Sequence, residues 1–157
     1  MKIAWIIKIA KDEQGQALVE FALIFTLLVI LLFGIAEFGR GWYYANALSN
    51  GARAGVRYAS LQPRTSTADE VRRYTFGQVT SASVEQSRLF VNVSAFRKNS
   101  GVGFAVTDTF EDISSGDAVM VIASYRMNAV TGHIVPTFSE DNTKTIVRKA
   151  TMRYEGN

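Results

Sequence analysis

One uncharged, apolar run near the amino terminus constrains this chain more than any other feature. It extends from Phe21 to Ala36 with the sequence FALIFTLLVILLFGIA, in which Thr26 carries the only hydroxyl group. Residues 16–19 lengthen it to about 20 residues, interrupted only by Glu20, and as a helix it would span about 30 Å. That length matches the hydrocarbon core of a bilayer. The run is typical of a membrane helix or a signal sequence, and not of the core helix of a soluble domain.

A helical pattern continues beyond this run as far as Ser60. Small residues recur at every fourth position, at Ala47, Gly51, Gly55 and Ala59. A ridge of this kind allows another backbone to approach closely. Each glycine costs a helix about 1 kcal/mol relative to alanine, so packing must offset that cost. Because Pro63 disfavours helix at the residue before it, we predict one helix of about 45 residues that ends near Leu61.

The rest of the chain is long enough for one small domain. The protein has 157 residues, and about 95 of them follow Leu61. The formal charge of +3 is mild and the basic residues are scattered, which argues against a nucleic-acid partner. The chain has no cysteine, which excludes disulfides, thiolate catalysis and cysteine metal sites.

Hydrophobic periodicity after the long helix predicts a second helix and several strands. The second helix covers residues 65–79, with Thr67 as its N-cap and Glu70 three residues later. The strands are expected at Leu89–Phe96, Phe104–Phe110, Asp117–Arg126 and Thr143–Tyr154, the third of them central. We therefore predict an α+β fold in which a small antiparallel sheet packs on the outer half of the long helix and meets the Ala47–Ala59 ridge.

Reactive groups are sparse. His133 is the only histidine and has no cysteine partner, so it makes a poor metal site. The densest acidic cluster contains Asp108, Glu111, Asp112 and Asp117, but it lacks the ordered oxygen ligands and the glycine of a calcium loop. No serine lies in a nucleophile elbow, and no glycine-rich loop carries a phosphate-binding lysine. The sequence predicts no catalytic residues, no metal and no cofactor, and hence a protein that is not an enzyme.

The residues before the apolar run have a pattern of their own. Lys2, Lys8 and Lys11 precede it, Gly15 stands immediately before it, and Glu20 follows five positions after that glycine. This arrangement resembles the processing motif of type IV prepilins, in which a peptidase cuts after the glycine on the cytoplasmic side. The resemblance implies cleavage between Gly15 and Gln16.

A longer resemblance covers residues 14–59. The segments GQALVEFAL from Gly15, FGIAEFGR ending at Arg40, and ALSNGARAGVRYA ending at Ala59 are similar to the amino-terminal sequence of TadE-like proteins. These are minor pseudopilins of the tight-adherence (Tad, or Flp) pilus system. A looser likeness extends to residues 150–155. The resemblance implies a pilin-like fold and a role in initiating or assembling a Tad pilus.

Physical chemistry offers a use for Glu20 that agrees with this resemblance. A carboxylate near the end of a membrane helix costs less than one at its centre, where insertion costs about 2.5–3.5 kcal/mol. Cleavage after Gly15 would create an α-amino group on Gln16, one helical turn from Glu20. Pairing of these charges, within one helix or between neighbours, would set the register of an assembly. In that assembly we expect the long helix to pack against sibling helices through the ridge of Ala47, Gly51, Gly55 and Ala59.

These observations lead to a four-part organisation. Residues 1–15 form a prepilin-type leader, 16–36 the membrane half of the helix, 37–61 its exposed half, and 62–157 a small periplasmic α+β domain. The resemblance implies a single-pass protein of the bacterial inner membrane that can enter an extracellular pilus. Its expected partners are the prepilin peptidase, other pseudopilins, the major pilin, the inner-membrane platform proteins and the lipid bilayer.

Two alternatives remain open. Gly34-Ile-Ala36 resembles the cleavage site of an ordinary signal peptide, and a cut there would release a secreted or periplasmic binding domain that starts at Glu37. Alternatively, an uncleaved chain would be a single-pass membrane protein with an adhesive or sensory domain.

Overall fold

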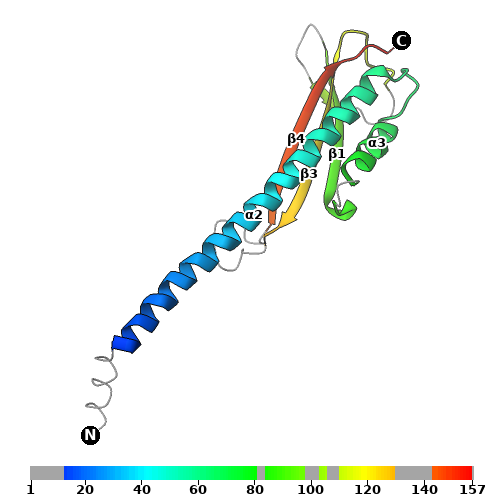
Figure 1. Ribbon diagram of the computed structural model, residues 1–157. Helices are drawn as coiled ribbons and strands as arrows, with labels where there is room; N and C mark the ends of the chain where they lie inside the picture. Colours follow the sequence, from blue (N-terminus) through cyan, green and yellow to red (C-terminus); the bar gives the residue numbers. More distant parts are fainter. Residues whose placement is uncertain (1–12, 81–83, 98–102, 106–109, 130–142, 157) are drawn as a thin grey trace. The chain divides into compact units, whose positions relative to one another are not determined.

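The computed structural model describes residues 13–80, 84–97, 103–105, 110–129 and 143–156. These residues belong to two compact units, with a boundary between Gly39 and Arg40. The elements, labelled as in Figure 1, are α2 (Glu13–Leu61), α3 (Ala68–Thr80), the 3₁₀ turn η1 (Gln86–Arg88), β1 (Leu89–Phe96), β2 (Gly103–Ala105), β3 (Ala118–Asn128) and β4 (Thr143–Arg153).

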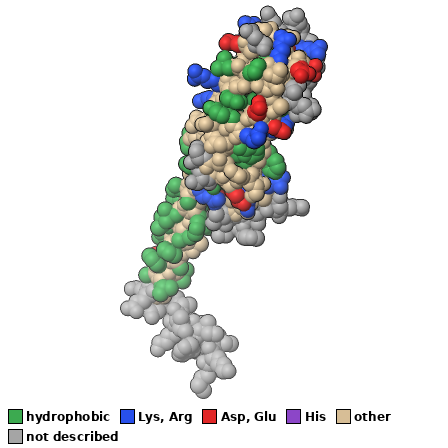
Figure 2. Space-filling view, turned by 90° about the vertical axis from the view of Figure 1, so that its right-hand side faces the viewer, with side chains coloured by type: hydrophobic (Ala, Val, Ile, Leu, Met, Phe, Trp, Pro, Cys, Tyr) green, Lys and Arg blue, Asp and Glu red, His purple; other side chains and the backbone are tan. Residues whose placement is uncertain are grey.

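Helix α2 is continuous over 49 residues, as the sequence predicted, and its amino-terminal part belongs to the first unit. Nearly every side chain from residue 15 to residue 36 is exposed, including Phe21, Leu27 and Ile35 at 61–68% exposure. Figure 2 shows hydrophobic side chains covering this part of the helix. In the described part of the chain, α2 is the one helix long and apolar enough to cross a membrane, and its most apolar stretch of 18 residues has a mean hydropathy of 2.8.

The second unit contains a four-stranded antiparallel sheet in the order β2-β1-β3-β4. Apolar side chains alternate along β1 and β3, so each strand buries one of its faces. On the buried face Val91 pairs with Ala123, and Val93 pairs with Val121. β3 lies between β1 and β4, which confirms that it is the central strand (Figure 1). The predicted α+β fold, with a long helix and an antiparallel sheet, is confirmed.

The core of this unit combines the buried sheet face with the carboxyl-terminal half of α2 and with α3. Leu48, Ala52 and Val56 of α2 are at most 3% exposed and belong to one cluster with the inward residues of β1 and β3. The rings of Tyr44 on α2 and Tyr125 on β3 lie 4.7 Å apart. Tyr44, Leu48, Ala52 and Val56 recur at four-residue spacing on one side of α2, and this side packs on the sheet.

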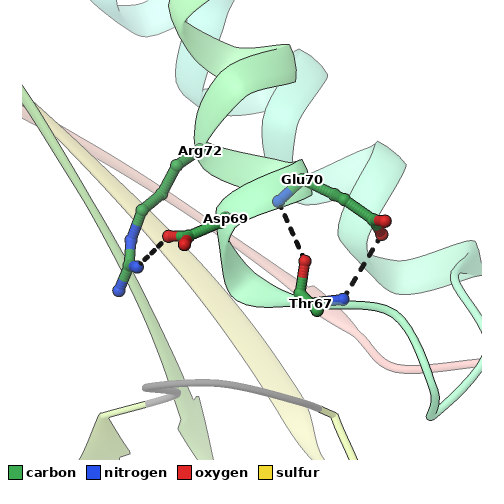
Figure 3. Close-up of polar contacts among 4 residues, drawn as sticks. All are labelled: Thr67, Asp69, Glu70 and Arg72. Atoms are coloured by element: carbon green, nitrogen blue, oxygen red, sulfur yellow. Dashed lines mark hydrogen bonds and ion pairs between the residues drawn. The ribbon is translucent and has the colours of Figure 1, made fainter.

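Local sequence determines where α3 begins. Glu70 N donates to Thr67 Oγ1 at 3.4 Å, and Thr67 N donates to Glu70 Oε2 at 3.3 Å (Figure 3). This is the predicted capping box, which satisfies two backbone donors that the helix itself leaves unpaired. Arg72 pairs with Asp69 at 2.5 Å on the exposed side of the same turn.

The strand predicted at Phe104–Phe110 is only partly right. β2 is limited to Gly103–Ala105, Phe110 lies in a turn closed by Ile113 N and the Phe110 carbonyl at 3.0 Å, and residues 106–109 are outside the described part. Phe110 is fully buried and stacks on Tyr154 at 5.9 Å. A buried aromatic residue in a turn has the same apolar character as one in a strand, so periodicity could not distinguish the two.

The segment after β4 is joined to the end of α2. The Tyr154 hydroxyl donates to the Gln62 carbonyl at 2.7 Å, and Glu155 N donates to the Ser60 carbonyl at 2.9 Å. Tyr154, which the sequence placed in the last strand, lies beyond it and is fully buried. These bonds satisfy carbonyls that the carboxyl end of α2 leaves without intrahelical partners.

Candidate functional site

The residues of the predicted processing site lie together on the first described turns of α2. Gly15, Gln16 and Glu20 are exposed, and Gln16 Nε2 donates to Glu20 Oε1 at 3.2 Å. Residues four apart on a helix share a face. The carboxylate of Glu20 therefore already lies next to the residue on which cleavage would create an α-amino group.

This geometry has an electrostatic consequence for a chain cut after Gly15. The new ammonium group would lie one turn amino-terminal to Glu20, so an exchange of the Gln16 amide donor for the charged amine requires only a local movement. An ion pair in an apolar medium is much stronger than the same pair in water. Each unpaired charge in such a medium costs several kcal/mol. The ammonium group and the Glu20 carboxylate are therefore more favourable there as a pair than either charge is alone.

The apolar segment that follows has no internal polar group left unsatisfied. Thr26 Oγ1 donates to the Ala22 carbonyl at 2.7 Å, as expected for a hydroxyl in a helix, and the Phe21 and Phe25 rings stack at 5.8 Å. Helices of this kind suit lipid because all backbone groups bond within the segment. The exposed surface of residues 15–36 therefore fits a bilayer or the apolar faces of other helices.

The small-residue ridge of α2 lies against α3 of the same chain. A β-carbon on Gly51 would overlap Val79 Cγ2, and one on Gly55 would overlap Thr75 Oγ1. Ala59 is fully buried, whereas Ala47 is half-buried beside the core. The sequence predicted that the sheet would meet this ridge. At the two glycines the partner is instead a helix, because α3 needs the close backbone approach that glycine allows.

Two further observations concern this helix pair. Thr75 is fully buried, and its hydroxyl donates to the Val71 carbonyl of its own helix at 2.7 Å, so this hydroxyl has a partner although it lies against Gly55. Tyr58 of α2 and Tyr74 of α3 stack with ring centroids 4.4 Å apart. The glycine ridge is thus already occupied within the chain. Its packing against a sibling subunit stays a prediction.

Three members of the acidic cluster seen in the sequence are described, and they differ in burial. Asp117 is buried, and its Oδ2 accepts a hydrogen bond from Ser114 N at 3.0 Å, which closes a turn containing Gly116 at a φ of 97°. Glu111 and Asp112 are exposed, and Asp108 is outside the described residues. Within the described ranges no group of three or more His, Cys, Asp or Glu side chains could hold a metal ion. His133 also lies outside these ranges.

Sequence reasoning missed two tyrosines that the fold buries. Burial raises the pKa of Tyr154, and Arg64 acts in the opposite direction. Burial also raises the pKa of Tyr125, and its neighbour Tyr44 adds to this effect. The only signal available was their position next to strand ends, because alternation alone does not show which tyrosine hydroxyl is buried.

Comparison with known proteins finds a family match for most of helix α2. Residues 15–57 match the family model described as TadE-like protein, a range that begins at Gly15 and includes Glu20, Gly51 and Gly55. No curated protein matches the chain, and no solved structure does. The recognition made from the sequence is therefore confirmed over residues 15–57, a match consistent with a TadE-like protein of Tad pilus systems.

Proposed function

We propose that this protein is a minor pilin-like subunit of a Tad pilus, anchored in the bacterial inner membrane by residues 16–36 of α2. Its α+β domain faces the periplasm and takes part in initiating or assembling the filament. The match of residues 15–57 to the TadE-like family supports this function, because that family is a structural component of Tad pilus systems.

The observation that carries the proposal is the arrangement at the amino end of α2. Gly15 precedes an exposed apolar helix, and Glu20 contacts the residue that would become the new amino terminus, at 3.2 Å. An ordinary signal peptide needs no carboxylate at this place. A subunit that must align its helix with those of its neighbours gains a register from it.

Several partners follow from the proposed function. A prepilin peptidase removes residues 1–15, and the inner-membrane platform proteins, other pseudopilins and the major pilin contact the mature chain. The exposed apolar surface of residues 15–36 supplies the contact with lipid and with sibling helices. Because α3 covers the glycine ridge, the membrane half of α2 is the main surface that remains for association with other helices.

The test is the amino-terminal residue and intact mass of the protein taken from the membranes of its own host. We expect a chain that begins at Gln16 and remains in the membrane fraction. A soluble chain that begins at Glu37 would show signal-peptide release. A membrane-bound chain that keeps Met1, in cells with an active peptidase, would show an uncleaved single-pass protein. Either of these results would refute the proposal.

A further inference from the structure

β4 forms one edge of the described sheet, and this edge is long. β4 has 11 residues, pairs on one side with β3 along its whole length, and has no second neighbour among the described strands. None of its side chains is buried, whereas β3 alternates buried and half-buried residues. The opposite edge is β2, with only three residues. An edge strand offers unpaired backbone donors and acceptors to another extended chain.

The charge of this edge has a single sign. The sequence of β4, TKTIVRKATMR, contains four basic residues and no acidic one. All four, Lys144, Arg148, Lys149 and Arg153, are exposed. Arg126, also exposed, is the partner of Thr145 on the neighbouring strand. Apart from Arg126 and β4, residues 40–157 contain nine basic and ten acidic residues, so the excess of positive charge is local to this edge.

The register shows which face of the sheet each charge belongs to. Arg148 pairs with Ala123, a residue of the buried face, whereas Lys149 and Arg153 pair with Ile122 and Ala118 of the opposite face. The two faces of the edge therefore both carry positive charge. Ile146 and Ala150 contact the core and hold the strand in place.

This charge pattern selects between possible occupants. Two copies of β4 placed side by side would bring basic residues together, and like charges opposite one another in a sheet are unfavourable. An acidic strand would instead form cross-strand ion pairs on both faces while its backbone completes the ladder. Charge complementarity thus favours an acidic partner over a second copy of this edge.

We propose that β4 binds an extended acidic segment of a partner protein by antiparallel strand addition. The register implies a pattern in that segment, which begins at its amino end with an acidic residue opposite Arg153. After three further residues come two consecutive acidic residues, opposite Lys149 and Arg148. Two apolar residues then lie opposite Val147 and Ile146. The proposal does not depend on leader removal, because the edge belongs to the second unit.

The experiment uses the full chain in nanodiscs of neutral phosphatidylcholine and a fluorescent ten-residue peptide with this pattern. Fluorescence anisotropy measures the affinity. A peptide with glutamine in place of each glutamate should bind at least about tenfold more weakly. Raising the ionic strength about tenfold, from about 0.05 M to about 0.5 M, should also weaken the binding of the acidic peptide.

Variants of the protein locate the binding site. R148E combined with K149E should lower the affinity at least about tenfold. R148Q combined with K149Q, a milder change to the strand, should give an intermediate loss. Arg73→Glu reverses one basic charge at an exposed position of α3 and should change the affinity less than about twofold. Circular dichroism establishes that each variant is folded.

Backbone methylation distinguishes strand addition from simple charge attraction. Alternate amides of an added strand face the edge, so of two peptides, N-methylated at odd or at even positions, one should lose binding and the other keep it. Equal binding of both, or Arg73→Glu acting as strongly as the β4 variants, would overturn the proposal. Binding of phosphatidylglycerol vesicles but not of the acidic peptide would also overturn it and assign the edge to a membrane surface.

Discussion

Gly55 on α2 lies so close to Thr75 on α3 that a β-carbon on the glycine would overlap the threonine hydroxyl and lie 3.1 Å from Thr75 Cβ. One turn earlier, Gly51 has the same relationship with Val79. Helix α2 therefore accepts the helix-propensity cost of two glycines in order to bring α3 against it. The contact is internal to one chain and shapes the domain that follows the apolar segment of α2.

The first prediction concerns these glycines. Gly55→Ala should destabilise the domain by about 1–3 kcal/mol, because overpacking outweighs the gain in helix propensity. Gly77→Ala is the matched control, since nothing lies within 4 Å of its β-carbon position and it should stabilise α3 by about 0.5–1 kcal/mol. Urea unfolding followed by circular dichroism in detergent measures both. If Gly55→Ala were as stable as Gly77→Ala, the close helix contact would be wrong.

A second prediction tests the capping box of α3. Thr67→Ala removes the hydroxyl that accepts from Glu70 N and should cost about 0.5–2 kcal/mol. Thr65→Ala changes an exposed threonine two residues earlier and should be nearly neutral. Thermal unfolding of the two variants provides the comparison. Equal melting temperatures would mean that Thr67 does not cap the helix.

A third prediction concerns alkaline pH. Because burial raises the pKa of Tyr154 above 10.0, the unfolded chain loses this proton at lower pH than the folded chain. The unfolded state then binds fewer protons above pH 10.0, so the free energy of unfolding falls as the pH rises through that range. Below it, this contribution to stability is fully present. Tyr125 acts in the same direction.

The variant Tyr154→Phe separates this effect from packing. At neutral pH it should lose about 0.5–1.5 kcal/mol, because the Gln62 carbonyl loses its hydrogen bond from the tyrosine hydroxyl. Above pH 10 its stability should fall less steeply than that of the unmodified protein. Chemical unfolding at pH 7 and at about pH 11 measures the difference. Parallel curves for the two proteins would contradict a titrating Tyr154.

A fourth prediction addresses processing. Gly15→Ala should slow removal of the leader, because a side chain is introduced next to the bond that the peptidase cuts. Gly34→Ala places the same methyl group at a helix position with nothing within 4 Å and should mature at the normal rate. Pulse-chase labelling in the host resolves precursor from mature chain. Normal maturation of Gly15→Ala would count strongly against the processing motif.

A fifth prediction addresses assembly. Glu20→Gln keeps a hydrogen-bond acceptor for Gln16 but removes the charge that would pair with the new amino terminus. We expect export and membrane insertion to be intact and co-purification with sibling subunits to be weaker. Glu111→Gln, an exposed carboxylate of the second unit, should leave assembly unchanged. If the two variants assembled equally well, Glu20 would have no role in register.

Some parts of the fold could be predicted because they depend on near neighbours in the chain. The capping box needs only Thr67 and Glu70, three residues apart, and the strand at Leu89–Phe96 follows from simple alternation. The partner of the Ala47–Ala59 ridge could not be predicted in the same way. Small residues at four-residue spacing permit a close approach but do not say which element approaches.

By itself, the sequence determined the long apolar helix, its glycine–glutamate pair, the α+β class and the TadE-like resemblance, because these follow from hydropathy, helical periodicity and short-range spacing. The tertiary structure decided that α3 fills the glycine ridge, that Phe110 and Tyr154 close the end of α2, and that β4 is a basic edge of the described sheet. These features depend on contacts between residues distant in sequence. Such contacts are set by the packing of the whole domain, which no local pattern contains.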